Sequence, residues 1–585
     1  MSSIKIFNSA FIGSSTDYNE LSKLAYKVGY LVSPLCSTIE VLEFLQKQVV
    51  DYGSTFYKSF DQVASMSRWE LFLDQVAHYA STYGTNYTGE MYVPKGFADI
   101  PAFTTFKVIM PITKKEAIKR CEAMLVSGIA LSQETIEDVL AVLGQCNHTI
   151  DINIVKNKEA KMWLYKATGT TPSDAVEMVR YLIFIATENS LLIKDKQTIE
   201  AIKIANLDIS KEVESFGLDK MSSVFLRFKP LFLAFKKANP ILINRLRKLA
   251  IKNHKPTQAG YWESILSNPE LVGQLPIKLL ELNNFKKVTL LEAIKVRLSG
   301  CKIQTFGIRN GKIWLSEEVL WKDEQPKKTV NREYLKFIET IIYQSLVDSM
   351  KLKATRIQLP IGVNLTLPKS EKSFVGNFPL GTTIDLSNSN AIVGINWRGQ
   401  EGASDLDLAL VDIDGTKFGW NANYTNQTKT VVYSGDMTSA NPEATELMFA
   451  SNGFKPSIVK VNLYTGNENS KFKFFVAKSD YKGDRNPTID PNDIVVSVDL
   501  EMESKEMSLG VITENKFHIA KFRTGNGQVA GDSVTNKYIN YVLETINCYV
   551  DMKTLLIDSG FILVNSNSEI DLTNLSKDSL IKLIG

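Results

Sequence analysis

The sequence predicts an α+β protein with several domains, in which an irregular α-helical array precedes a β-sandwich. Through residues 1–350, many segments place apolar residues every three or four positions, the period of an amphipathic helix. From about Arg356, short alternating runs are separated by Asp, Asn, Gly, Ser and Thr, which is typical of a sandwich or barrel. A chain of 585 residues is also too long for a single hydrophobic core.

The expected helices span residues 21–30, 39–52, 69–83, 114–127, 133–144, 172–187, 220–254, 289–298 and 331–350. Thr171-Pro172-Ser173-Asp174 predicts a capped helix start with proline in the first turn. We find no strict repeat period in this half, which favours an irregular array over a consensus solenoid. A short β-hairpin is expected near 303–316, because Asn310-Gly311 suits a two-residue turn between two apolar runs.

The second half predicts about ten short strands, over 357–367, 382–386, 391–397, 406–411, 430–433, 457–464, 471–478, 494–498, 508–514 and 516–522. A helix over 536–548 and a strand over 560–564 follow. A terminal helix over 576–584 is expected to be capped by Ser576. These elements give three regions: a helical region over 1–350, a sandwich over 351–570 and a C-terminal helix within 571–585.

Composition indicates a cytoplasmic protein that does not enter a membrane. The N-terminus lacks the charged head and apolar core of a secretory signal, and no apolar run is long enough to span a bilayer. The five cysteines are scattered without a CxxC pair, which argues against a disulfide framework or a structural zinc site. Because the net charge is only +3, any attraction to nucleic acid requires a local basic patch.

Two motifs in the predicted sandwich resemble a known family. Ser404-Asp405-Leu406-Asp407-Leu408 follows an apolar strand, and Tyr433-Ser434-Gly435-Asp436 comes some thirty residues later. Their order and spacing resemble the D-x-D-L strand and the S/T-G-D turn of the TerD family of tellurium-resistance and stress-response proteins. Glu446 falls where that family places an acidic residue before its next strand. The resemblance covers about residues 350–570, and the helical half only loosely.

The resemblance implies a β-sandwich whose acidic loops bind calcium, in proteins without an established catalytic activity. Asp405, Asp407, Asp436 and Glu446 are the candidate ligands, since calcium takes six to eight oxygen atoms. Asp405 and Asp407 are two apart on a strand, so their carboxylates leave the same face. The chain departs from the family at Met437, where an Asn ligand is usual, and in its thinner acidic cluster. The alternative is that these residues are turn formers and solvated strand charges.

Other acidic and histidine residues give weaker signals. Asp412-Ile413-Asp414-Gly415 is expected to form a hairpin turn and not half an EF-hand, because no bidentate Glu follows. Asp74 and His78 lie one helical turn apart, which is more typical of a hydrogen bond than of a metal site. No nucleophile elbow, Walker loop, Rossmann fingerprint or zinc-protease motif is present, so we expect a protein that is not an enzyme.

The segment 227–255 is basic and contains no acidic residue. On the expected helix, Arg245, Lys248 and Lys252 line one face, which predicts binding of RNA or another polyanion. The alternative is a solvated face neutralised by acidic helices, for example near residues 212–214. The sequence therefore leaves two functions open. The first is a TerD-like stress or defence protein with a calcium-binding sandwich and a partner-recruiting helical part. The second is a structural or assembly protein, phage- or element-encoded, or an RNA-binding scaffold.

Overall fold

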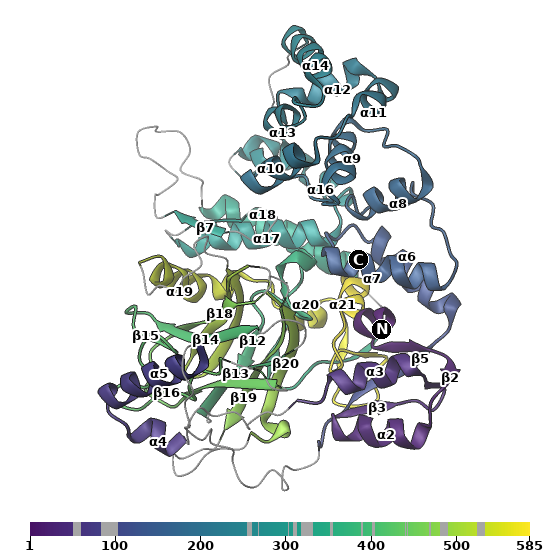
Figure 1. Ribbon diagram of the computed structural model, residues 1–585. Coiled ribbons are helices and arrows are strands. Elements are labelled where there is room, and N and C mark those ends of the chain that lie inside the picture. The colour runs from purple at the N-terminus through teal and green to yellow at the C-terminus, as the bar shows by residue number, and fades with distance from the viewer. Residues whose placement is uncertain are drawn as a thin grey trace.

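The computed structural model describes residues 1–50, 60–83, 103–253, 260–266, 268–301, 304–307, 313–316, 332–350, 355–387, 390–399, 404–438, 440, 443–466, 470–479, 489–502, 504–522 and 533–585. It confirms the α+β class, with helices dominating the first part and antiparallel sheets the second (Figure 1). No helix of the described residues is both long enough and apolar enough to cross a membrane.

The chain begins with a small α/β unit. Its elements are α1 (Ser2–Phe7), β1 (Ser9–Phe11), β2 (Gly13–Ser14), α2 (Tyr18–Lys27), β3 (Tyr30–Val32), β4 (Cys36–Ser37), α3 (Ile39–Lys47) and β5 (Lys107–Ile112). The longer strands form a parallel sheet in the order β1-β5-β3. The expectation of helices alone in this region was wrong. Strands β1 to β4 have two or three residues, too few to show an alternating pattern, and the six residues of β5 do not alternate.

The expected run over 220–254 is divided into three helices, and the helices over 60–65, 160–168, 196–205, 210–216, 261–264 and 275–280 were not predicted. The helical elements that follow the α/β unit therefore match the predicted ones only in part. They are α4 (Phe60–Ser65), α5 (Arg68–Tyr83), α6 (Lys114–Val126), α7 (Gln133–Gln145), α8 (Ala160–Thr168), α9 (Ala175–Thr187), α10 (Lys196–Ala205), α11 (Ser210–Phe216), α12 (Leu218–Phe225), α13 (Lys229–Ala234), α14 (Pro240–Lys252), α15 (Tyr261–Ser264), η2 (Pro269–Gln274), α16 (Leu275–Leu280), α17 (Asn284–Ser299) and α18 (Arg332–Met350). The start of α9 differs from the prediction. Asp174 is its N-cap and accepts hydrogen bonds from the backbone of Val176 and Glu177, so Pro172 lies before the helix.

Helices α8 to α14 form a helical lobe (residues 160–253) with its own apolar core. Phe184, Phe225, Phe232 and Leu246 are among the side chains that fill this core. Figure 1 shows the lobe at the top of the molecule, away from the sandwich. The predicted hairpin is present as β6 (Gln304–Gly307) and β7 (Ile313–Ser316), paired antiparallel. Its turn residues Asn310 and Gly311 lie outside the described residues.

Two antiparallel sheets form the sandwich. One has the order β15-β14-β18-β21-β22-β12-β9, and the other β16-β17-β13-β19-β20. Their strands are β9 (Val363–Asn364), β12 (Thr383–Asp385), β13 (Asn390–Arg398), β14 (Asp405–Asp412), β15 (Lys417–Phe418), β16 (Val431–Tyr433), β17 (Glu443–Ala450), β18 (Ser457–Thr465), β19 (Lys471–Ser479), β20 (Ile494–Glu501), β21 (Glu506–Thr513) and β22 (Lys516–Phe522). The rings of Phe474 and Phe517, one from each sheet, lie 5.6 Å apart between centroids, so the sheets pack face to face. Strand β17 was not among the predicted strands.

Smaller elements close the chain around the sandwich. They are β8 (Arg356–Gln358), η3 (Glu371–Ser373), β10 (Phe374–Val375), β11 (Phe378–Pro379), η4 (Pro491–Asp493), α19 (Ser533–Thr545), η5 (Ile546–Cys548), α20 (Met552–Asp558), β23 (Ile562–Leu563), β24 (Ile570–Asp571) and α21 (Lys577–Ile584). Ser576 caps α21 in a capping box, as the sequence predicts. Helix α21 packs near α6, and Asp578 of α21 accepts a hydrogen bond from Arg120 of α6 at 2.8 Å.

The main apolar core is continuous between the helical region and the sandwich. Leu125 of α6 and Ile338 of α18 belong to the same core as Phe475 of β19. Polar contacts join the two halves as well: Lys369 pairs with Glu292, Lys372 pairs with Glu159, and Glu371 accepts hydrogen bonds from Ser132. Residues 351–354, at the predicted boundary, lie outside the described residues. The helical region and the sandwich therefore share one continuous apolar core.

Candidate metal centre

Three acidic side chains meet where an edge of each sheet comes close to the other. Asp405 and Asp407 lie on β14, and Asp436 lies just after β16. One carboxylate oxygen from each lies within 4.8 Å of the others, and the exposed fraction of each residue is 1% or less. Within the described part of the chain, no other three His, Cys, Asp or Glu residues gather in this way. The structure thus brings together three of the four predicted ligands.

Glu446, the fourth predicted ligand, lies against this acidic cluster. It is inside β17 and not before a strand as expected, and it is fully buried. Its Oε2 accepts a hydrogen bond from the backbone N–H of Leu408 at 2.7 Å, and its Oε1 from that of Met437 at 3.0 Å. Glu446 therefore ties β17 to β14 and fixes the backbone next to Asp436.

The electrostatics of the cluster are those of crowded, buried anions. Burial raises the pKa of Asp407 well above its usual value, and the charges of Asp436 and Asp405 raise it further. Burial, Asp407 and Asp436 likewise raise the pKa of Glu446, although its two backbone hydrogen bonds act in the opposite direction. Without a cation, the cluster favours protonated carboxyl groups.

Asn462 is a site residue that the sequence analysis did not identify. It lies directly opposite Asp407 in the pairing of β14 with β18, and its Nδ2 donates to Asp407 Oδ2 at 3.1 Å. Asp407 Oδ1 and Asn462 Oδ1 are buried and have no hydrogen-bond partner among the described residues. A polar residue on a strand was visible in the sequence, but its position opposite Asp407 depends on which strands pair.

Two further titratable groups lie near the cluster, one on helix α5 and one on the neighbouring strand β15. His78 of α5 is hydrogen-bonded to the backbone of Asp436, and burial lowers the pKa of its imidazole. His78 thus contacts the backbone of a predicted metal ligand, which the sequence analysis did not anticipate. Lys417 of β15 is the second group. Burial lowers the pKa of its amine to about 8, against the attraction of Asp407.

Met437 and Asp412, two neighbours of the predicted ligands, have structural roles. The side chain of Met437 is buried in the main core, and its backbone N–H donates a hydrogen bond to Glu446. The predicted turn at Asp412 is confirmed, because Asp412 Oδ1 accepts hydrogen bonds from the backbone of Asp414 and Thr416 at 2.9 and 2.8 Å. Asp412 thereby closes the β14–β15 hairpin and lies outside the acidic cluster.

The donor set of the cluster fits a hard divalent cation. Carboxylate oxygens are the ligands that calcium and magnesium prefer, whereas zinc favours nitrogen and sulfur. The unpartnered Oδ1 of Asn462 offers the kind of amide oxygen that Met437 does not provide. An orphaned carboxylate oxygen on Asp407 points to the same conclusion, since a buried acceptor without a donor is costly.

The predicted basic face lies on α14 of the helical lobe. Arg245, Lys248 and Lys252 are exposed, while Leu242 and Leu246 on the opposite side are buried. Within the described residues, none of the three cations takes part in an ion pair, with Glu212, Glu214 or any other acidic residue.

The chain was also compared with models of protein families, with curated proteins and with solved structures, and none of these matches it.

Proposed function

We propose that this chain is a non-enzymatic, TerD-like stress or defence protein whose sandwich binds calcium through Asp405, Asp407 and Asp436. The observation that supports the proposal is that these three carboxylates are buried and lie within 4.8 Å of one another. In this proposal, Glu446 and Asn462 position the ligands, and the helical part recruits a protein partner.

The physical argument rests on the energetics of burying like charges. An isolated ionised carboxylate is strongly disfavoured in a protein interior, so it becomes protonated, pairs with a cation or coordinates a metal. The charges of Asp436 and Asp405 disfavour the ionised form of Asp407, and the hydrogen bond from Asn462 and the charge of Lys417 offset them only in part. Calcium bound at the cluster would supply two positive charges and make the ionised form of all three carboxylates favourable.

The rival function is that of a structural or assembly protein in which the same carboxyl groups stay protonated. The raised pKa values of Asp407 and Glu446 are the observation that favours it. The two proposals differ in one measurable property, since the rival predicts no tightly held ion. Both are compatible with RNA binding at Arg245, Lys248 and Lys252.

The test is the thermal melting of the full-length protein in calcium, in magnesium and in EDTA, together with its metal content as purified. A ligand that binds only the folded state stabilises it by about 2.7 kcal/mol at one hundred times its Kd. We expect millimolar calcium to raise the Tm of the wild type and to leave the Tm of Asp407→Asn unchanged.

Asp414→Asn is the matched control, because Asp414 is 58% exposed in the hairpin turn outside the cluster. This variant should keep the full calcium response. A wild-type protein that shows no calcium-dependent shift and carries no metal would refute the calcium proposal and favour the structural role.

A further inference from the structure

The helical lobe has an uneven charge distribution. Residues 160–253 contain 16 Lys or Arg and 9 Asp or Glu. The acidic residues all lie at or before Asp219, while residues 220–253 contain nine basic residues and no acidic one. The lobe therefore presents a positive surface although the whole chain is nearly neutral.

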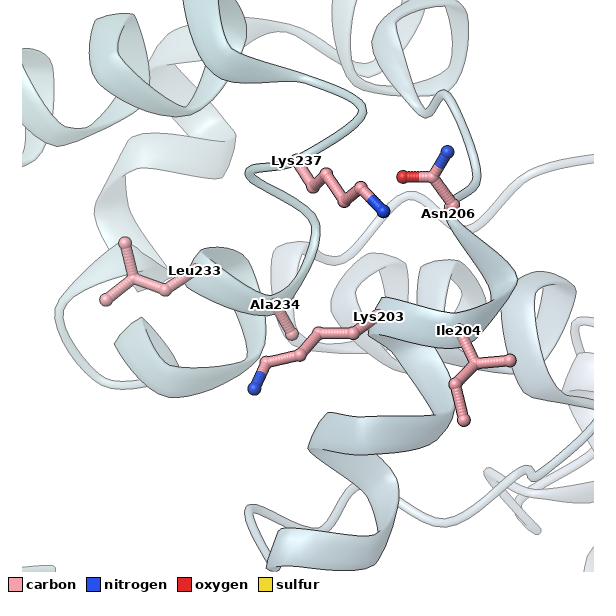
Figure 2. Close-up of a pocket in the computed structure, with 6 residues that line it drawn as sticks. All are labelled: Lys203, Ile204, Asn206, Leu233, Ala234 and Lys237. Carbon is pink, nitrogen blue, oxygen red and sulfur yellow. The ribbon is translucent and has the colours of Figure 1, made fainter.

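A hollow of about 450 Å³ lies in this surface between α10 and α13. It is lined by Lys203, Ile204, Asn206, Leu233, Ala234 and Lys237. Figure 2 shows Lys237 reaching from the α13–α14 connection toward Asn206, while Lys203 extends from α10 past Ala234. Two cations from different elements thus belong to a lining that also includes aliphatic side chains.

The cations of the hollow are available to a ligand. Lys237 is exposed and takes part in no ion pair within the described residues. Lys203 contacts Glu200 at 2.7 Å, but both side chains are about half exposed. Such exposed pairs contribute little to stability, so a carboxylate from a partner can replace Glu200 at little cost.

The exposed apolar residues of the lobe are all aliphatic. Ile204 is 82% exposed and Ile241 is 84% exposed, and Leu233 and Ile251 are exposed as well. In this fully described segment, no large aromatic side chain is exposed. Proteins that bind single-stranded nucleic acid stack bases on exposed aromatic rings, so this surface lacks the usual platform for single-stranded RNA.

We propose that the hollow between α10 and α13 binds an acidic segment of another protein, with an aliphatic side chain in the hollow and carboxylates on Lys203 and Lys237. The two lysines favour an acidic partner through charge complementarity. Exposed Ile204 and Leu233 favour an apolar side chain in the bound segment. The basic face at Arg245, Lys248 and Lys252 adds long-range attraction for the same partner. This inference rests on the proposed recruitment of a partner by the helical part, and it does not depend on the metal site.

The test uses the full-length protein and a labelled helical peptide that carries one leucine with glutamates one turn away on either side. Fluorescence anisotropy would compare this peptide with its glutamine analogue and with a labelled RNA hairpin. We expect the glutamate peptide to bind more tightly than either. The double change Lys203→Gln and Lys237→Gln should weaken peptide binding about tenfold or more, because it removes both charged donors that would bind the glutamate carboxylates.

The matched control is Lys196→Gln with Lys211→Gln, which removes the same charge from exposed lysines of the lobe that do not line the hollow. It should weaken binding much less. Ile204→Ser should also weaken binding of the glutamate peptide without changing the melting temperature, because Ile204 is mostly exposed.

Three results would overturn the inference: no binding of the glutamate peptide, an equal loss in the control pair, or tighter binding of the RNA hairpin. The calcium-dependent melting shift, measured on the same variants, is expected to stay unchanged. A failure of the peptide experiment is therefore distinguishable from a failure of the calcium proposal.

Discussion

Glu371→Gln tests how strongly the sandwich is held to the helical region. Glu371 is 3% exposed, and its carboxylate accepts hydrogen bonds from the backbone and hydroxyl of Ser132 at 2.7 and 3.0 Å. It also accepts a hydrogen bond from the hydroxyl of Thr135, and Lys577 Nζ lies 2.9 Å away. One carboxylate thus joins the N-terminus of α7 to the C-terminal helix α21.

The expected loss of stability follows from the buried charge of Lys577, which Glu371→Gln leaves without its partner. Removing one partner of a buried ion pair costs about 3–5 kcal/mol, because the remaining charge is uncompensated. Lys577 is 17% exposed, and the charges of Glu134 and Asp138 also act on it, so part of this cost is relieved. We therefore expect Glu371→Gln to lower the free energy of unfolding by about 2–3 kcal/mol.

The effect should also depend on pH. Burial alone would raise the pKa of Glu371, but the charge of Lys577 and the hydrogen bonds from Thr135 and Ser132 lower it below the usual value. A lowered pKa stabilises the folded state above the unfolded-state value of about 4.3, and this stability is lost as the pH falls. The difference between wild type and Glu371→Gln should therefore shrink in acid below that pH.

The assay is urea unfolding of the full-length protein, followed by tryptophan fluorescence and far-ultraviolet circular dichroism. A double-mutant cycle with Lys577→Met isolates the energy of the pair. Glu281→Gln is the control, because Glu281 forms an exposed pair with Lys278 at 3.3 Å and should lose less than about 1 kcal/mol. If Glu371→Gln is no more destabilising than Glu281→Gln, the buried contact does not hold the two halves together.

Three more predictions follow from single positions. In EDTA at neutral pH, differential scanning calorimetry should show a higher Tm for Asp407→Asn than for the wild type, because the change replaces a buried acid beside Asp405 and Asp436 with an amide. A lower Tm would show that the hydrogen bonds of Asp407, and not its charge, determine the stability at this position. His518 is 6% exposed, and burial lowers its pKa from 6.5 to about 4, so the wild type should lose about 3 kcal/mol as the pH falls from 6.5 to 4 while the unfolded state takes up the proton. His518→Gln should flatten urea midpoints over that range, and an unchanged slope would contradict this assignment. Gly394→Ala should cost about 1–3 kcal/mol in urea unfolding, because a Cβ atom there would overlap the Phe475 ring and Leu447, whereas Gly144→Ala has free space and should be neutral or stabilising.

The sequence by itself determined the features that depend on neighbouring residues. Helix α9 and helix α18 follow from apolar spacing, and the Ser576 cap follows from a hydroxyl placed one residue before an amphipathic run. The turn at Asp412 is equally local, because its side chain bonds to backbone groups two and four residues ahead. Asp405 and Asp407 could be paired in advance since alternate residues of a strand share a face.

Only the tertiary structure decided which of these local features meet. Asp436 reaches Asp407 because the edges of the two sheets converge, and Asn462 lies opposite Asp407 because β18, and not another strand, pairs with β14. Contacts such as that of His78 with the Asp436 backbone leave no local pattern. Strand neighbours and register are set by the packing of the whole core, in which each pairing depends on all the others, and not by any one segment of the sequence.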